Sequence, residues 1–449
     1  MPLPITTRRE FLHKGLALVA AGASVPAFLQ QTVFAIDNPL DQALTQKPGG
    51  KDDRILVVVQ LAGGNDGLST VIPFGDDLYY RNRPALGMPA RDLLKIDNYL
   101  GVPKEFVRLK SLFDDRRMSI IQGVGYPNPN RSHFRSMDIW HSAIPDRENV
   151  ANGWLGRYFD CTCTGIDPHV GVSIGETLPL AMKGDRITPL SFEKSENYRY
   201  NGADRARYEK LNTGTNVVPD IEVEAPATQP IKPPVMLGRS RNPRARTPVE
   251  PINPQTQLDF LTRTATDARV SSDTIANLIG KYQPAGEYPG GEFGEGLRTI
   301  AAMIAGGLST RVYYVSLGGF DTHAGQANRH AQLMDQFARG IQAFTTDLKK
   351  QENSDRVLVM AFSEFGRRVT QNASGGTDHG AAGPMFLFGP EMKTSVIGQH
   401  PSLANLDQGD LKYAVDFRNV YASILQNWMD TPSRPILGEQ FKVFPFLKT

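Results

Sequence analysis

The sequence predicts an α/β protein with a mostly parallel central sheet and helices on both faces. Three observations support this. Short apolar runs, typical of strands buried on both faces, occur at 55–61, 118–123, 312–317, 357–362 and 385–388. Helical patterns alternate with them, at 103–115, after 132, and at 257–279, 294–308, 326–349 and 415–429. Finally, several of the runs end in glycine-rich turns that carry acidic residues or histidine.

These turns predict a binding site at one edge of the sheet. The first run leads into Gly63-Gly64-Asn65-Asp66, the run at 312–317 into Gly318-Gly319-Phe320-Asp321-Thr322-His323, and the run at 357–362 into Ser363-Glu364. Ligands of parallel sheets bind outside the carboxyl ends of the strands. Carboxylates and imidazoles suit zinc or manganese, so we expect a divalent metal there. The alternative is that these residues are ordinary loop carboxylates and helix-capping groups.

The first 35 residues are interpreted as an export signal. Arg8 and Arg9 form a twin-arginine pair, residues 15–28 are apolar but short, and Val33-Phe34-Ala35 offers a cleavage site. An uncleaved membrane anchor is the alternative. We expect the twin-arginine translocase to deliver the protein to the periplasm or the exterior, with no membrane span after cleavage. Replacing Arg8 and Arg9 by Lys should stop export, and unchanged secretion would contradict this.

Charge and cysteine content narrow the possible partners. The chain has 49 Lys and Arg against 47 Asp and Glu, and the leader accounts for the whole formal excess of +2. A near-neutral mature protein is not expected to bind nucleic acid. The 2 cysteines, Cys161 and Cys163, are too close in sequence for an unstrained disulfide, which favours a free pair in a loop.

The domain organisation follows from changes in composition. Residues 36–53 are polar and rich in turn formers, as in a linker, and 54–449 are predicted to form a single domain. Within it, residues from about 212 to 254 are rich in proline and lose apolar periodicity, which indicates an insertion or surface loop.

The motifs resemble known proteins. Phe320-Asp321-Thr322-His323, Ser363-Glu364-Phe365-Gly366 and Thr377-Asp378-His379-Gly380 are similar to motifs of the alkaline phosphatase superfamily, which includes sulfatases. More closely, the leader, Gly63–Gly67, Arg131–Phe134 and the turns after 317 and 362 resemble an exported bacterial family known as domain of unknown function 1501. This resemblance implies an alkaline phosphatase-like fold. It implies no particular reaction, because that family has no settled one.

The superfamily resemblance also implies metal ligands. Superfamily members hold two metals, and Asp66 matches the first-strand aspartate of one site. Asp321 and His323 match the Asp and His of the other, although the superfamily usually places that histidine four residues on. We therefore expect one tight divalent ion, or a second weaker one, with zinc, manganese and calcium as candidates.

The remaining ligands can be assigned in two ways. Position after the strand assigns Glu364 to the Asp66 site, with Phe365 in place of a histidine, and gives His379 to the Asp321 site. The Asp-His sequence motif at Asp378-His379 instead favours assigning these two residues to the Asp66 site. We prefer the first, because the strand end is what places a ligand.

A nucleophile is implied at the start of the helix after 132, where superfamily enzymes place a hydroxyl. Ser132 is the candidate, with an ordinary helix N-cap as the alternative. In several members the hydroxyl lies about four residues before the histidine that resembles His133, and here that residue is Pro129. His133 is then either a transition-state donor or a ligand.

Cationic side chains near these motifs could hold an oxyanion. Arg131, Arg367 and Arg368 are candidates to clamp phosphate or sulfate oxygens, against the alternative of ordinary surface charge.

The favoured function is an exported metal-dependent hydrolase of phosphate or sulfate esters, acting on a small-molecule or glycan ester. The alternative is a catalytically inactive secreted binding protein on the same fold, which Phe365, Pro129 and the proline-rich segment support. A mutase acting on phosphosugars is a third possibility, and it needs a hydroxyl nucleophile.

Overall fold

The computed structural model describes residues 54–162, 168–193 and 275–448. The predicted leader, linker and proline-rich insertion, as well as Cys163 and nearly all of the predicted helix at 257–279, lie outside these ranges. Within them, no helix is both long enough and apolar enough to cross a membrane.

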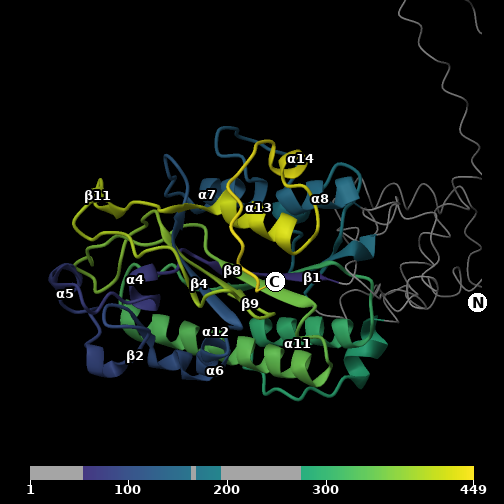
Figure 1. The fold of residues 1–449 in the computed structure, drawn as a ribbon, viewed down its shortest axis with the longest axis horizontal. Coiled ribbons are helices and arrows are strands. Elements are labelled where there is room, and N and C mark those ends of the chain that lie inside the picture. Colours follow the sequence, from purple (N-terminus) through teal and green to yellow (C-terminus); the bar gives the residue numbers. More distant parts are fainter. Residues whose placement is uncertain (1–53, 163–167, 194–274, 449) are drawn as a thin grey trace, which may run out of the picture.

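A nine-stranded sheet forms the centre of the molecule (Figure 1). Its strands are β1 (Ile55–Ala62), β4 (Met118–Gly125), β5 (Gly171–Ile174), β6 (Leu190–Phe192), β7 (Val312–Gly318), β8 (Val357–Phe362), β9 (Gly383–Phe388), β10 (Val396–Ile397) and β13 (Val415–Asp416). Their order is β10-β4-β9-β8-β1-β7-β5-β6, and β13 pairs with the end of β4. Only β9 runs antiparallel to its neighbours, so the predicted mostly parallel sheet is confirmed.

Helices and two small hairpins complete the described chain. The labelled α-helices are α4 (Gly67–Thr70), α5 (Asp77–Asn82), α6 (Lys110–Asp114), α7 (His133–Ser142), α8 (Trp154–Thr162), α11 (Glu292–Ala305), α12 (Gln326–Lys350), α13 (Phe417–Asn427) and α14 (Arg434–Leu437). Residues 275–281 are also helical. Short 3-10 helices are η3 (Ala90–Asp92), η4 (Lys104–Leu109), η5 (Pro168–Val170) and η6 (Leu180–Met182). The hairpins pair β2 (Leu93–Lys95) with β3 (Gly101–Pro103), and β11 (Leu406–Asp407) with β12 (Asp410–Leu411).

The helices form a layer on each face of the sheet. Helices α6, α11 and α12 lie on one face, and α7, α8, α13 and α14 lie on the other (Figure 1). The side chains of β1 alternate accordingly: Val57 and Val59 join the core under α11 and α12, whereas Leu56 and Val58 join the core under α7 and α13. Burial on both faces explains why these strands read as continuous apolar runs.

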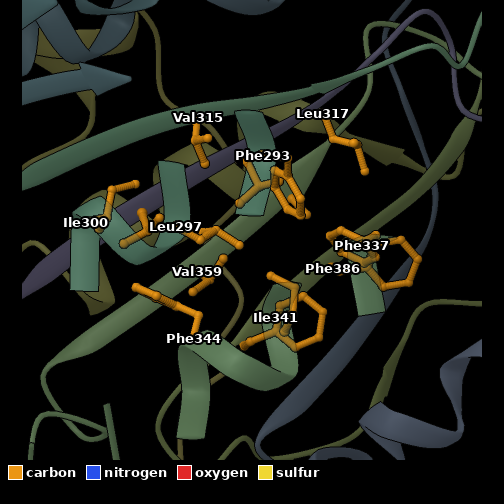
Figure 2. Close-up of a cluster of buried hydrophobic side chains, with 14 of the residues drawn as sticks. Phe293, Leu297, Ile300, Val315, Leu317, Phe337, Ile341, Phe344, Val359 and Phe386 are labelled. Atoms are coloured by element: carbon orange, nitrogen blue, oxygen red, sulfur yellow. The ribbon is translucent and has the colours of Figure 1, made fainter. Parts of the chain in front are cut away.

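The core on the α11 and α12 side is rich in aromatic side chains. Figure 2 shows residues of both helices facing residues of the sheet. Phe337, Phe386 and Phe388 pack in pairs with ring centroids about 6 Å apart, the spacing of favourable aromatic contacts. This packing anchors α12 along its length, so that its first turn has a fixed position at the edge of the sheet.

Three strands bring the predicted motifs together. Strand β1 lies between β8 and β7 and is parallel to both, with Gln60 paired to Phe362 and Ala62 paired to Gly318. The turns that follow these strands therefore start at the same edge of the sheet, and they carry the predicted site residues.

Two helix boundaries differ from those predicted. The segment predicted as a helix at 103–115 begins as the 3-10 turn η4 after Pro103 and becomes α-helical only at Lys110. Helix α13 begins at Phe417 rather than at Val415, because Val415 and Asp416 pair with β4 and the Asp416 carboxylate caps the helix through Arg418 N–H.

Candidate metal centre and active site

The turn after β1 packs closely against the turns after β7 and β8 because it begins with two glycines, Gly63 and Gly64. Gly63 has φ of +118°, and a Cβ there would lie 2.5 Å from the backbone N of Asp321. Gly64 has φ of +78°, and a Cβ there would lie 2.3 Å from the ring of Phe365. Any larger side chain would push the three turns apart, so the glycines set the spacing of the site.

Three histidines and one aspartate converge at this edge. We call His133, Asp321, His323 and His379 the histidine cluster. The Nε2 atoms of His323 and His379 lie 2.9 Å apart, and each lies 3.0 Å from Oδ1 of Asp321. Nε2 of His133 lies 3.4 Å from the other oxygen, Oδ2. His133, Asp321 and His379 also present ligand atoms within 4.8 Å of one another.

Each histidine is oriented by an acceptor behind it. Nδ1 of His323 faces Asp378 Oδ1 at 3.0 Å, and Nδ1 of His379 faces the carbonyl oxygen of Arg131 at 2.7 Å. Nδ1 of His133 faces Glu364 Oε1 at 2.9 Å. An acceptor at Nδ1 holds the proton there, which leaves a lone pair on Nε2 when the ring is neutral. This is the usual arrangement of metal-binding histidines.

The geometry of the histidine cluster fits a small divalent ion. Nitrogen lone pairs and a carboxylate that face one another at about 3 Å repel unless a proton or a cation lies between them. Tetrahedral ligand atoms with metal bonds of about 2.0–2.1 Å are separated by roughly 3.3 Å, close to the distances seen here. In addition, Nε2 of His133 is buried and has no hydrogen-bond partner among the described residues.

The carboxylates of the site stay ionised. Burial opposes ionisation of Asp321, but the hydrogen bond from Arg367 and the contact with His379 outweigh it and hold the pKa of Asp321 well below its usual range. The hydrogen bond from His323 lowers the pKa of Asp378. In contrast, the hydrogen bond to Glu364 raises the pKa of His133, although partial burial opposes this.

Glu364 and Asp378 support histidines rather than joining the histidine cluster. Glu364 is buried, and its Oε1 also accepts a hydrogen bond from the backbone N–H of Gly63 at 2.8 Å. Asp378 uses the same oxygen, Oδ1, for His323 and for the side-chain amide of Asn372. Both were predicted as direct metal ligands. In the structure Glu364 contacts Nδ1 of His133 and Asp378 contacts Nδ1 of His323, on the side of each ring away from Nε2.

Asp66 is not brought to the histidine cluster. It is buried and forms a two-pronged ion pair with Arg83, with N···O distances of 2.5 and 2.9 Å. Ser69 and Gln326 also donate hydrogen bonds to its carboxylate, which caps α4 as well. Metal ligation by Asp66 would require breaking this pair, so we leave it out of the proposed site.

Arg367 ties the turns together rather than facing a substrate. It is buried and donates hydrogen bonds to the carbonyl oxygens of Gly63, Gly64, Phe320 and Thr377, and to Oδ1 of Asp321 at 2.7 Å. A guanidinium with these contacts has no free face for a phosphate or sulfate. The predicted oxyanion clamp is therefore not formed by Arg367 in this structure.

The other two arginines share a carboxylate. Both Nε and Nη2 of Arg131 donate to Oδ2 of Asp410, and Nε of Arg368 lies 3.3 Å from Oδ1 of Asp410. Burial raises the pKa of Asp410 despite these arginines. Arg131 thus contributes to the site through its carbonyl oxygen, which orients His379, and not through its charge.

Ser132 precedes α7 with an unused hydroxyl. It occupies the N-cap position, but its side chain makes no capping hydrogen bond, and its backbone N–H bonds Asn130. The side chain is exposed. Ser132 is therefore the N-cap residue of α7, as the alternative predicted, but its hydroxyl caps none of the N–H groups of the first turn.

The supporting roles of several residues were not predicted from the sequence. Phe365 packs its ring against both His133 and His379, with centroid distances of 4.9 and 4.7 Å. The carboxylate of Asp66 is held by Arg83, 17 residues along the chain, and by Gln326, 260 residues along it. Their pairing depends on the tertiary structure, and no sequence signal indicates it.

The fold and the site together define an α/β protein with a histidine-rich centre at the carboxyl ends of its strands. Residues 236–433 match the sequence profile described as "Protein of unknown function (DUF1501)". This match confirms the predicted relationship to that family, and it covers the turns that carry Asp321, Glu364 and His379. No curated protein matches the chain.

Solved structures give only weak similarity. Ps i-CgsB is 9% identical with a TM-score of 0.33, and the match covers 87% of this chain and 77% of that one. The lipoteichoic acid synthase LtaP from Listeria monocytogenes is 8% identical with a TM-score of 0.33, covering 86% and 79%. The PsFucS1 sulfatase from Pseudoalteromonas sp. is 10% identical with a TM-score of 0.33, covering 94% and 75%. Scores of this size do not establish a common fold, so the α/β assignment rests on the sheet itself.

Proposed function

We propose that Asp321, His323 and His379 of the histidine cluster bind a divalent metal and that the protein is an exported metal-dependent hydrolase of phosphate or sulfate esters. The observation that carries the proposal is the convergence of Nε2 of His323 and Nε2 of His379 on Oδ1 of Asp321. These three residues would hold the ion. Two imidazoles and one carboxylate favour zinc or manganese over calcium, which prefers ligand sets made only of oxygen.

The chemistry of such a site suits ester hydrolysis. A bound divalent ion supplies Lewis acidity and lowers the pKa of a nearby water or hydroxyl. Ser132 offers an exposed hydroxyl next to His133 in the chain, and the N-terminus of α7 offers N–H groups to an anionic group. Ser132 is therefore the proposed nucleophile.

His133 is the proposed proton donor to the leaving oxygen. Its Nε2 stands 3.4 Å from Asp321 Oδ2, farther than the 3.0 Å contacts of the other two rings with Oδ1. The hydrogen bond to Glu364 raises its pKa, which favours the protonated form needed for this role. Phe365 packs against the ring and limits its rotation.

A measurement of metal content beside turnover tests the proposal. Purified protein should contain about one equivalent of zinc or manganese by plasma mass spectrometry, and should hydrolyse 4-nitrophenyl phosphate or sulfate. Asp321→Ala should lose both. Asp335→Ala, a carboxylate on α12 that pairs with surface arginines, is the matched control and should lose neither. Turnover that survives Asp321→Ala would refute the proposal.

The arginine contacts favour a second candidate, an inactive binding protein that keeps the metal. The guanidiniums of Arg131 and Arg367 are engaged by protein groups, so neither is free to clamp an oxyanion. Metal lost in Asp321→Ala, with no turnover of either ester in the native protein, would support this candidate.

A further inference from the structure

A cavity lies beside α12 and shares no lining residue with the histidine cluster. Its volume is about 540 Å³, within the range of small-molecule sites. It is formed by α4, the segment from Leu86 to Leu94, the start of η4 and the first turns of α12. We call it the α12 pocket.

One side chain gives the α12 pocket a directed polar group. His330 lines it and is only 4% exposed. Nε2 of His330 faces Asn65 Oδ1 at 3.0 Å, so Nε2 carries the proton and Nδ1 keeps a lone pair. Among the described residues, Nδ1 of His330 has no hydrogen-bond partner. It is also not one of the fully buried polar atoms that lack a partner, so part of Nδ1 is accessible. Nδ1 is therefore reached from the pocket.

The remaining lining sets the character of a ligand. Leu86, Met88 and Leu93 contribute apolar walls. The charged residues of the lining balance, since Arg91 and Lys104 are matched by Asp92 and Glu105. Burial lowers the pKa of His330 to about 4, so the ring is neutral at pH 7. Nothing in the lining therefore favours an ionic ligand.

We propose that the α12 pocket binds a neutral, largely apolar alcohol or phenol whose hydroxyl donates a hydrogen bond to Nδ1 of His330. The apolar part of the ligand lies against the leucine and methionine walls, where its burial supplies most of the affinity. The hydroxyl supplies selectivity, because a ligand that lacks a donor leaves Nδ1 buried and unpaired. This site is independent of the proposed hydrolase activity.

Two matched probes test the selectivity. 2-Naphthol and 2-methoxynaphthalene have the same ring system, but only the first has a donor. In calorimetric titrations of the full chain, we expect about one equivalent of 2-naphthol to bind, about 5- to 10-fold more tightly than the methyl ether. In His330→Phe the two probes should bind alike.

A second variant pair locates the binding site without touching the histidine. Ala331→Trp places an indole in the α12 pocket and should abolish binding, whereas Gln332→Trp, at the next and exposed position of α12, should leave it unchanged. Circular dichroism shows whether each variant is folded. Undiminished binding to folded Ala331→Trp, equal affinity for the two probes, or no saturable binding up to about 1 mM would overturn the proposal.

Discussion

Replacing Arg367 by Met should destabilise the protein far more than loss of a substrate contact would. The guanidinium donates to four buried or partly buried carbonyl oxygens and to Asp321. Each carbonyl left without a donor costs about 1–3 kcal/mol. The carbonyl oxygen of Phe320 keeps its hydrogen bond from the backbone N–H of Thr322, so three carbonyls lose their donor. Even the lower figure gives about 3 kcal/mol for these three, which agrees with the roughly 3–5 kcal/mol measured when one partner of a buried charge pair is removed.

Urea unfolding followed by tryptophan fluorescence measures this loss, because Trp140, Trp154 and Trp428 are all buried. Arg91→Met is the control: its side chain is 84% exposed, so its unfolding free energy should change by less than about 0.5 kcal/mol. Arg367→Lys keeps the charge near Asp321 but cannot reproduce the fork of donors, so an intermediate loss is expected.

An unchanged stability of Arg367→Met would instead support the role predicted from the sequence, a clamp for phosphate or sulfate oxygens. A substrate clamp contributes little to stability in the absence of substrate. If Arg367→Met unfolded within about 0.5 kcal/mol of the native protein while losing affinity for phosphate or sulfate, the structural interpretation would be refuted.

Four other variants test the remaining roles. Ser132→Ala should lower ester turnover by orders of magnitude with unchanged metal content, and retained turnover would assign the attack to water. Asp378→Asn should weaken zinc affinity about 10- to 100-fold in competition with a chelator, and unchanged affinity would contradict its supporting role. Glu364→Gln should lower the pKa of His133 in an NMR titration, because the hydrogen bond to the carboxylate raises it, and an unchanged pKa would remove Glu364 as the cause. For Asp66, burial is outweighed by Arg83, which lowers the pKa from 3.8 to about 2. Its carboxylate should therefore contribute about 2 kcal/mol above pH 5 that is lost as the pH falls towards 2, and an equal acid sensitivity in Asp66→Asn would contradict this.

Much of the fold could be predicted because apolar periodicity records burial directly. The runs that became β1, β4, β7 and β8 are buried along most of their length, and such strands have few polar positions to obscure the pattern. The short strands β5 and β6 and the hairpins were not predicted, since a few residues carry too little periodicity.

The sequence also indicated the place of the site. Parallel strands end at the same edge of a sheet, so the residues directly after β7 and β8 were expected at that edge. Asp321 and His323 follow this rule, and the structure gathers them with His379 and His133.

The role of each side chain could not be predicted, because it depends on which partner lies opposite. Asp66 and Asp321 both follow buried strands, and the sequence assigned both to metals. In the tertiary structure Arg83 and Gln326 donate hydrogen bonds to the carboxylate of Asp66, which leaves it unavailable to a metal. The second keeps 46% of its side chain exposed and faces imidazoles.

By itself the sequence determined the α/β class, the relationship to the family of unknown function that residues 236–433 match, and the edge of the sheet where the chemistry lies, since these follow from burial patterns and local motifs. Only the tertiary structure decided that Arg367 joins the turns through hydrogen bonds and that Glu364 and Asp378 orient histidines through Nδ1. It also decided that the hydroxyl of Ser132 makes no capping hydrogen bond. Hydrogen bonds and ion pairs are short-ranged and directional, so which groups they join is settled only when distant segments are packed together.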